Sequence, residues 1–419
     1  MDILLLAQAQ AEYTIQLRRH FHEFPEAGPT EQVETLKTIA SELDTMGIRH
    51  IRVPGGGLFG FIDGPVRGKT VLLRADTDAL PVQEDPCNLK GPRKCVSKIP
   101  GVMHACGHDS HTAMLLTEAK ILKSLKNQLK GSVILMFEEG EEGFCKVEKL
   151  CGYIQESGLS IDTCYSTHVC WDMPTGKIAC TKGTALSGLY CFDLMIHGQG
   201  GHGSRPDLCN SPVDCFTAIY EAMQALRLKV VDPRSCLTWS IGQIHAGKSS
   251  NVVPEDLSAS GTIRFFDISN GRRFWEEFGR TVDELGKLYR CHTKLICRQI
   301  LEPTINDPAC RKLFLDVVEK NLGSDALMDW GPWMASESFS YMTSMYPGVS
   351  TFIGIKNEML GSGANHHTPQ FDLDEAALPK GVAAAVAYTL EFLENPPDTS
   401  GFQSLCGSLK ELVDMLHQE

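Results

Sequence analysis

The feature that most constrains the fold is a set of short segments whose apolar residues run without interruption. They lie at residues 69–76 (KTVLLRAD), 132–137 (SVILMF) and 350–355 (STFIGI). Unbroken apolar runs of this length are typical of strands buried on both faces. Residues 30–47 and 113–129 instead carry apolar side chains at helical spacing. Strands that alternate with helices predict an α/β domain with a mixed, mostly parallel sheet and helices on both faces.

The middle of the chain has a different pattern. Its expected elements, in chain order, are a strand at 189–200, a helix at 211–228, strands at 236–247 and 255–266, a helix at 272–289 and a strand at 292–302. The order βαββαβ is the ferredoxin-like α+β arrangement. We therefore predict an inserted lid domain at 188–301, within a catalytic domain formed by residues 1–187 and 302–419.

Length, charge and cysteine usage limit the class of protein. With 419 residues, the chain is too long for one ordinary core. Its formal net charge of −13 argues against a nucleic-acid partner, because nucleic-acid binding proteins usually have a basic face. No apolar run reaches the length of a membrane span, and the acidic Asp2 argues against a secretory signal. The 16 cysteines are scattered rather than dense, which favours a cytoplasmic protein with reduced thiols. Together, these features predict a cytoplasmic protein with no nucleic-acid or membrane partner.

Several predicted strands are followed by side chains that can bind metals or transfer protons. Asp76 and Asp78 follow the first strand, the run 138–143 (EEGEEG) follows the second, His168 follows a strand at 162–167, and His366 and His367 lie beyond 350–355. In α/β sheets, reactive groups gather at the carboxyl ends of the strands. We therefore expect these side chains to meet at one edge of the sheet.

The segment 101–115 (GVMHACGHDSHTAML) is the richest in candidate ligands. It places Cys106 and His108 before a helix that we expect to begin at Asp109 or Ser110. One interpretation is that Asp109 only caps this helix and that the histidines are incidental. A Cys-x-His pair among three histidines, with acidic clusters at neighbouring strand ends, instead favours a metal site. Mixed sulfur, nitrogen and oxygen ligands suit zinc, manganese or a related metal, and do not choose among them.

The acidic run 138–143 also admits two interpretations. Charge runs usually form solvated turns. Because this run directly follows an apolar strand, we favour a catalytic role, in which one glutamate binds metal and its neighbour takes a proton from water. The pattern alone does not decide which glutamate does which.

The predicted lid carries three further candidates. The glycine-rich segment 198–206 (GQGGHGSRP) contains His202, and it is either a place of close backbone approach to a ligand or an ordinary connection. Asn251 and Arg264 lie on or beside predicted strands. Arg264 suits a two-pronged grip on a carboxylate, although a surface arginine has the same signature.

Several motifs occur together in an order that resembles the metal-dependent aminoacylase/carboxypeptidase family of amidohydrolases. They are RADTDALP, GVMHACGHDSHTAML, FEEGEEG, GQGGHGSRP, NVVP followed by GTIR, EPTIND, ASESFSY and HHTPQFDLDE. The chain looks most similar to the branch that contains hippurate hydrolase and the hydrolases of IAA (auxin)–amino acid conjugates. The resemblance implies an α/β catalytic domain with a two-metal centre and a smaller lid that commonly mediates dimerisation.

The resemblance also implies a role for each candidate residue. The metal ligands would be Cys106, His108, Glu142, His168 and His367, which would hold two divalent ions per chain, Mn²⁺ or Zn²⁺. Glu141 would be the general acid/base, Asp78 would steady a ligand, His202 would stabilise the developing oxyanion, in some relatives from the partner subunit, and Asn251 and Arg264 would hold the substrate.

The implied reaction is hydrolysis of the amide bond of an N-acyl amino acid, which releases a carboxylic acid and a free amino acid. The implied partners are this small-molecule substrate and a second copy of the chain, bound through the lid as a homodimer. Three alternatives stay open at this point. They are a dipeptidase or carboxypeptidase on the same scaffold, a catalytically silent metal or small-molecule binding protein, and thiol catalysis by Cys106 with His108 or His111 as base.

The chain departs from the pattern of the family it resembles at three places. Glu138-Glu139-Gly140 stands where Gln-Pro-Ala is usual, Asp207 stands where the branch often has His, and Ser338 stands where Asp is common. These departures leave the implied ligands intact and bear on metal preference and substrate. His366 and His367 are adjacent, and we favour His367 as the ligand because it directly precedes Thr-Pro.

Overall fold

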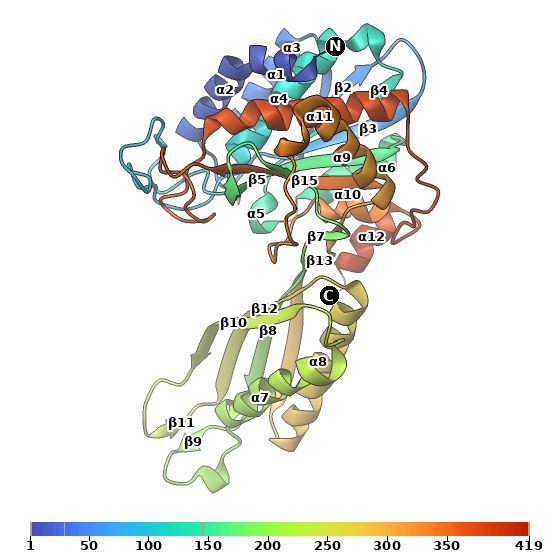
Figure 1. The fold of residues 1–419 in the computed structure, drawn as a ribbon. Helices are drawn as coiled ribbons and strands as arrows, with labels where there is room; N and C mark the ends of the chain where they lie inside the picture. The colour runs from blue at the N-terminus through green and yellow to red at the C-terminus, as the bar shows by residue number, and fades with distance from the viewer. Residues whose placement is uncertain (1, 29, 145, 418–419) are drawn as a thin grey trace. The chain divides into compact units, whose positions relative to one another are not determined.

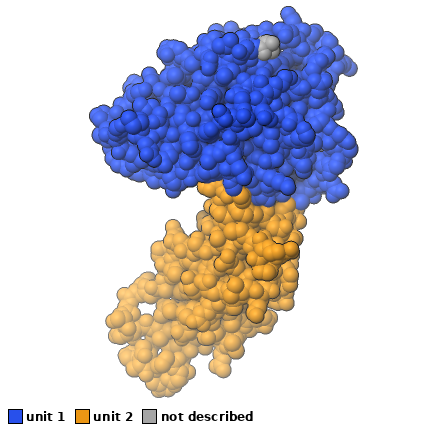
Figure 2. All heavy atoms as spheres, in the orientation of Figure 1, with its two compact units in different colours: residues 1–185, 305–331, 341–412 blue, residues 186–304, 332–340, 413–419 orange. Residues whose placement is uncertain are grey.

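The computed structural model describes residues 2–28, 30–144 and 146–417. The chain divides into two units (Figure 2). Each unit has its own hydrophobic core. Unit 1 consists of residues 1–185, 305–331 and 341–412, and unit 2 consists of residues 186–304, 332–340 and 413–419. Two cores are expected for a chain of this length, because a single core stops growing at about 250–300 residues.

Unit 1 is built on a seven-stranded sheet with the order β1-β2-β4-β3-β5-β15-β6 (Figure 1). Its strands are β1 (Arg49–Val53), β2 (Gly57–Asp63), β3 (Lys69–Asp76), β4 (Gly131–Glu138), β5 (Thr163–Pro174), β6 (Ile178–Ala179) and β15 (Gly348–Lys356). The neighbours β4, β3, β5 and β15 are parallel, whereas β1, β2 and β6 join through antiparallel pairs. This sheet confirms the mixed, mostly parallel arrangement predicted from the unbroken apolar runs.

Helices cover both faces of the unit 1 sheet (Figure 1). They include α1 (Ile3–Ala9), α2 (Ala11–Glu23), α3 (Val33–Thr45), α4 (His108–Ser124), α5 (Glu141–Phe144), α6 (Val147–Ser157), α9 (Pro308–Leu322) and α11 (Leu378–Glu394). Two short helices, α10 (Ser340–Met345) and α12 (Leu409–Leu416), contain the residues at which the chain passes between the two units. Two neighbours on β2 show the two faces. Leu58 belongs to the core cluster formed with α3 and α4, whereas the ring of Phe59 stacks on Tyr153 of α6 at 5.3 Å.

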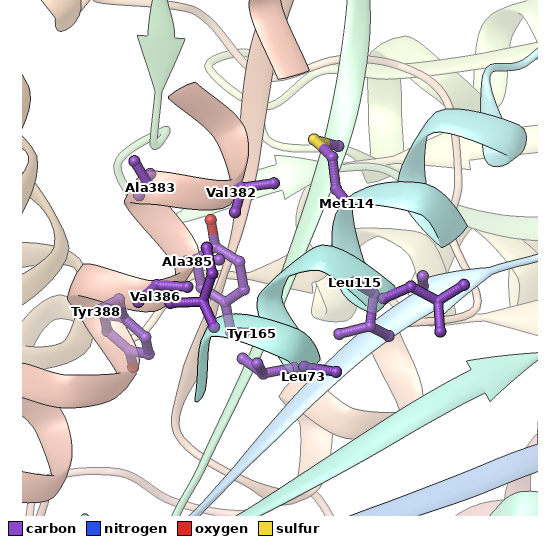
Figure 3. Packing of buried hydrophobic residues seen from close by; sticks show 14 of the residues in the cluster. Leu73, Met114, Leu115, Tyr165, Val382, Ala383, Ala385, Val386 and Tyr388 are labelled. Atoms are coloured by element: carbon purple, nitrogen blue, oxygen red, sulfur yellow. The ribbon is translucent and has the colours of Figure 1, made fainter. Parts of the chain in front are cut away.

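The core of unit 1 is formed by strands of the sheet, the helices packed on it and the C-terminal segment of the chain (Figure 3). Leu73 of β3, Leu115 of α4 and Tyr388 of α11 are all buried. The rings of Tyr165 and Tyr388 stack at 5.4 Å, and the hydroxyl of Tyr388 is 2.7 Å from that of Thr163. Burying a large apolar side chain contributes about 1.5–3 kcal/mol each, so this cluster fixes the helices on the sheet.

One helical stretch, Glu375–Glu394, is long and apolar enough to cross a membrane by length and composition alone. The expectation that no stretch reaches this length is therefore wrong on that criterion. Most of the stretch, which is α11 with its preceding turn, is buried inside unit 1. The same composition is expected of a core helix, because a helix that packs on several neighbours is apolar around most of its surface.

Unit 2 has a four-stranded antiparallel sheet with the order β10-β12-β8-β13. Its elements are β8 (Gly188–His197), β9 (Gly201–His202), α7 (Pro212–Val230), β10 (Leu237–Ala246), β11 (Val252–Val253), β12 (Asp256–Phe265), α8 (Ile268–Leu288) and β13 (His292–Leu301), and the short strands β7 (Thr184–Leu186) and β14 (Thr304–Ile305) lie in the connections to unit 1. The four long strands and two helices follow the predicted βαββαβ order. Unit 2 is therefore ferredoxin-like.

The two helices of unit 2 cover one face of its sheet. On β8, Phe192 is fully buried and its ring contacts the rings of Trp275 and Phe278 of α8. Met195, three residues further along the same strand, is 41% exposed because its side chain points to the opposite face.

This arrangement predicts unequal costs for two substitutions on one strand. Phe192→Ala should lower the free energy of unfolding of unit 2 by about 3–5 kcal/mol, because it removes a buried ring. Met195→Ala should cost less than about 1 kcal/mol, because its side chain is partly solvated already. Denaturant unfolding followed by far-UV circular dichroism measures both variants. Equal costs would contradict the assignment of the covered face.

Candidate metal centre

The carboxyl ends of the parallel strands bring the candidate side chains of unit 1 together. Asp76 ends β3 and Glu138 ends β4, and these two residues are register partners. β3 and β5 are in register as far as Arg74 and Ser166, which places His168 level with Asp76. The prediction that His168 follows its strand is wrong, since β5 continues to Pro174. His168 nevertheless lies at the common edge, because β5 extends beyond the end of β3.

A glycine turn shapes the segment that carries Cys106 and His108. Helix α4 begins at His108, and its N-cap is Gly107 with φ of 91°. The predicted start at Asp109 or Ser110 is therefore wrong by one or two residues. Glycine is required here, because a Cβ atom on Gly107 would lie 2.4 Å from a methyl carbon of Val169 and L side chains rarely adopt this φ. The turn allows the side chains on its two sides to converge.

The predicted ligands of unit 1 form overlapping clusters. In each of four groups, the possible ligand atoms lie within 4.8 Å of one another. The groups are Cys106 with His108 and His168, Cys106 with Glu142 and His367, His108 with Glu141 and Glu142, and Asp76 with His108 and His111. The structure therefore gathers all five predicted ligands and the predicted base Glu141 in one place.

Hydrogen bonds fix which ring nitrogen two of these histidines present. Nδ1 of His108 lies 3.0 Å from Oδ1 of Asp78, whose other oxygen accepts the backbone N–H of Glu142 at 2.9 Å. Nδ1 of His168 lies 2.7 Å from the carbonyl oxygen of Val169, so it donates that bond. Nε2 of each ring is then left toward the cluster, and that of His168 is 3.7 Å from Sγ of Cys106. Orientation of this kind is typical of metal-binding histidines.

The structure separates the adjacent histidines His366 and His367. Nε2 of His367 lies 3.0 Å from Oε1 of Glu142, and its backbone N–H donates to the carbonyl of Ala105 beside Cys106. His367 has a φ of 62°, in the left-handed region. The ring of His366 is buried and stacks on Phe371 at 4.8 Å. His367 is thus the member of the pair that belongs to a candidate ligand group.

Burial and nearby charges set the protonation of these groups. Burial, reinforced by neighbouring glutamates, raises the pKa of the Cys106 thiol well above its usual value. Burial lowers the pKa of His108, but Asp76 and two further carboxylates raise it more, to about 10. Burial also holds the pKa of His168 well below its usual value. A divalent cation fits this donor set, because it would replace the protons of the thiol and the imidazolium beside the carboxylates.

The motifs assign no role to Arg74, Arg18 and His22, which are buried beside the cluster. Arg74 donates to both Asp76 and Glu138, and Asp76 accepts a hydrogen bond from Nδ1 of His111 at 2.6 Å. Asp109 lies 2.7 Å from Nδ1 of His22 and pairs with Arg18, so it anchors the first turn of α4 rather than capping it. An arginine inside an otherwise apolar strand was the one available signal for this network.

The predicted lid residues lie at two ends of the unit 2 sheet. His202 is on β9, which pairs with β11, and the N–H of Gly203 donates to the carbonyl of Asn251 at 2.8 Å. These residues lie beyond one end of the β8–β12 pair, the end at which Asp256 is opposite His197. Arg264 pairs with Leu189 near the other end, where its Nη1 donates to Oγ of Ser336 at 2.6 Å.

The departures from the family pattern have local partners. Glu138 is paired with Arg74, and Glu139 is 3.5 Å from Nζ of Lys146. Asp207 forms an exposed ion pair with Arg205 at 2.6 Å. Ser338 is buried in unit 2, and its hydroxyl donates to Glu337 at 3.3 Å.

Comparisons with known proteins agree with the motifs and the geometry. The sequence pattern of the peptidase family M20/M25/M40 matches residues 72–391. The chain is 33% identical over 391 residues to IAA-amino acid hydrolase ILR1-like 2 of Arabidopsis thaliana, which covers 91% of this chain and 86% of that protein. It is 32% identical over 390 residues to thermostable carboxypeptidase 1 of Saccharolobus solfataricus, which covers 91% of this chain and 95% of that protein.

The fold also matches a solved structure of similar length. The YXEP protein of Bacillus subtilis, described as a dinuclear metal binding peptidase from the M20 family, superposes with a TM-score of 0.77 at 26% identity, over 92% of this chain and 99% of that one. The family match covers well over half of the chain. These findings confirm the resemblance: the chain belongs to the peptidase family M20/M25/M40 and is a metal-dependent amidohydrolase.

Proposed function

We propose that the protein hydrolyses the amide bond of N-acyl amino acids at a centre of two divalent ions, Mn²⁺ or Zn²⁺. The proposed ligands are Cys106, His108, Glu142, His168 and His367. The observation that carries the proposal is that these side chains fall into groups of three that share Cys106, His108 and Glu142. Shared members are expected where two ions lie side by side. Similarity to an IAA-amino acid hydrolase and to a dinuclear peptidase supports both the reaction and the number of ions.

The protein side chains divide the chemical work. When bound, the divalent ions supply Lewis acidity, which acidifies water and polarises the carbonyl group of the substrate. Glu141 takes a proton from the attacking water and returns it to the departing amine nitrogen. Its position in one group with His108 and Glu142 supports this role. Asp78 acts through its neighbours, since its two oxygens hold the ring of His108 and the backbone of Glu142.

The lid residues serve the substrate. Arg264 binds the carboxylate of the amino acid part, because a guanidinium offers parallel N–H donors to two oxygens. His202 stabilises the oxyanion that develops on the scissile carbonyl, and Asn251 helps to hold the substrate. We assign these residues to the lid domain of residues 188–301 and the metal ligands to the catalytic domain of residues 1–187 and 302–419.

The separation of the lid residues favours a homodimer. Arg264 and Asp256 are eight residues apart on β12, so at about 3.4 Å per residue the two ends of the ladder are about 27 Å apart. His202 and Asn251 lie beyond the Asp256 end. One small substrate cannot reach both ends within one lid. We propose that the His202 and Asn251 of a second copy complete each site.

The edge of unit 2 is suited to such pairing. Strand β10 lies at the edge of the sheet, and most of its residues are exposed. Tyr220 of α7 and Ile244 of β10 are 41% and 51% exposed, and they line a hollow of about 680 Å³ together with Trp239. Unpaired strand edges with exposed apolar side chains readily join a second chain.

A carboxypeptidase or dipeptidase is the second candidate. The similarity to thermostable carboxypeptidase 1 is close to that with the auxin-conjugate hydrolase, and the metal centre would serve both reactions. For the location we propose the cytoplasm, in agreement with the cysteines of the described part of the chain, which are all free.

The first experiment combines metal content with a substrate panel. Elemental analysis should find about two divalent ions per chain. The same preparation should release free amine from N-acyl amino acids, and chelation should abolish the release. Release from free peptides alone would favour the carboxypeptidase. A chain that binds no metal even after reloading would contradict the proposed centre.

The role of Glu141 predicts a separation of binding from turnover. Glu141→Gln should retain both ions and lower kcat by about 10²–10⁴-fold, because only the proton transfer is removed. Metal content by elemental analysis and steady-state kinetics check the two parts. A variant with normal turnover would show that another group is the base.

A shared site predicts recovery of activity when two inactive variants are mixed. Glu141→Gln and His202→Ala should each be nearly inactive. After dissociation and reassociation of an equal mixture, about a quarter of the wild-type activity should return, since half of the dimers carry one intact site. The control is a mixture of His202→Ala with the double variant Glu141→Gln/His202→Ala, which should stay inactive. No recovery with a confirmed mixed dimer would mean that His202 acts within its own chain.

A further inference from the structure

Glu138 lies at the start of a continuous chain of hydrogen bonds that leads to a proposed metal ligand. Its Oε2 accepts from Nε of Arg74 at 2.8 Å, and Nη1 of Arg74 donates to Oδ2 of Asp76 at 2.8 Å. Oδ1 of Asp76 accepts from Nδ1 of His111 at 2.6 Å. Four side chains thus connect β4, β3 and α4: Glu138, Arg74, Asp76 and His111.

The chain continues through the backbone of β5. Nε2 of His111 accepts a hydrogen bond from the N–H of Val169 at 2.9 Å. The hydrogen of the ring is therefore on Nδ1, which donates to Asp76. The carbonyl of the same residue, Val169, accepts from Nδ1 of His168 at 2.7 Å. The two backbone groups of Val169 therefore tie His111 to the ring of His168, whose Nε2 is turned toward Cys106.

We propose that Glu138 is a positioning residue that holds the ring of His168 in its ligating orientation through Arg74, Asp76, His111 and Val169. The proposal rests on the proposed function, because it takes His168 as a metal ligand. It assigns a structural role to the carboxylate of Glu138, which stands where the family usually has glutamine.

Burial makes the carboxylate of Glu138 a strong partner for Arg74. The side chains of Arg74, Asp76 and Glu138 are 3%, 1% and 0% exposed. A buried guanidinium needs anionic partners, and here it has two. With a neutral residue at 138, Arg74 would lose this carboxylate partner and keep its ion pair with Asp76. Asp76 would then shift toward Arg74, and its bond to His111 would weaken.

Glu139 offers a matched control for the loss of this carboxylate. It is adjacent in sequence and also fully buried, but its ion pair is with Lys146 and not with Arg74. Glu138→Gln and Glu139→Gln therefore remove the same charge from neighbouring buried positions. Only the first change interrupts the path to His168.

The test is a cobalt(II) titration of the metal-free protein, followed by the visible d–d bands and the thiolate-to-cobalt charge-transfer band. Glu138→Gln should weaken the binding of cobalt about 10- to 100-fold, as is usual when a partner behind a ligand is lost. Glu139→Gln should bind cobalt like the wild type. In the kinetics, Glu138→Gln should lower kcat and leave KM unchanged, because the substrate contacts are intact.

A second variant separates positioning from general damage. His111→Gln cuts the same path further along, so the double variant Glu138→Gln/His111→Gln should bind cobalt no more weakly than the worse single variant. Additive losses would contradict a common path. If Glu138→Gln does not fold, as judged by circular dichroism, cobalt affinity of His111→Gln against Glu139→Gln decides the question in the same way.

The outcomes distinguish this inference from the proposed function. If the wild type takes up cobalt and Glu138→Gln binds it equally well, Glu138 has no positioning role and the metal centre stands. If the wild type shows no thiolate-to-cobalt band, the proposed centre itself fails, and this inference fails with it.

Discussion

The parallel alignment of β4, β3, β5 and β15 is the constraint on which the rest of unit 1 depends. Parallel strands end on the same side of a sheet, so residues far apart in the sequence meet there. Asp76, Glu138 and His168 come to one level because the strands are in register. The unbroken apolar runs make this alignment stable, since helices bury both faces. A shift of one residue in β3, β4 or β5 would turn the side chain of Asp76, Glu138 or His168 to the opposite face of the sheet.

A second requirement is that charges buried at this edge find partners. Asp78, Asp109 and Asp76 each hold two neighbouring groups, and together they fix the turn, the helix start and the ring orientations. Leaving a buried charge unpaired costs several kcal/mol, so these contacts are mutually dependent. The proposed metal ligands are therefore oriented by polar contacts within the protein, as is typical of metal-binding side chains.

Much of this could be predicted from the sequence, for reasons that differ between elements. The order of elements in unit 2 is predictable because its strands and helices have a regular apolar period, as in the burial of alternate residues along β12. The predicted start of α4 is wrong, because Asp109 is a good N-cap by residue type and only the fit of Gly107 against Val169 places the cap earlier. The sequence pattern predicts that His168 follows its strand, because nothing local shows that β5 extends beyond β3.

The sequence by itself determined the fold class, the family and the kinds of side chain at the centre, because apolar periods and motifs are local properties of the chain. Only the tertiary structure decided which atoms converge. It turned His367 rather than His366 toward Glu142, set the ring orientation of His168, and placed Arg74 between Glu138 and Asp76. These outcomes depend on contacts between segments up to hundreds of residues apart, and no pattern within one segment encodes the geometry of such contacts.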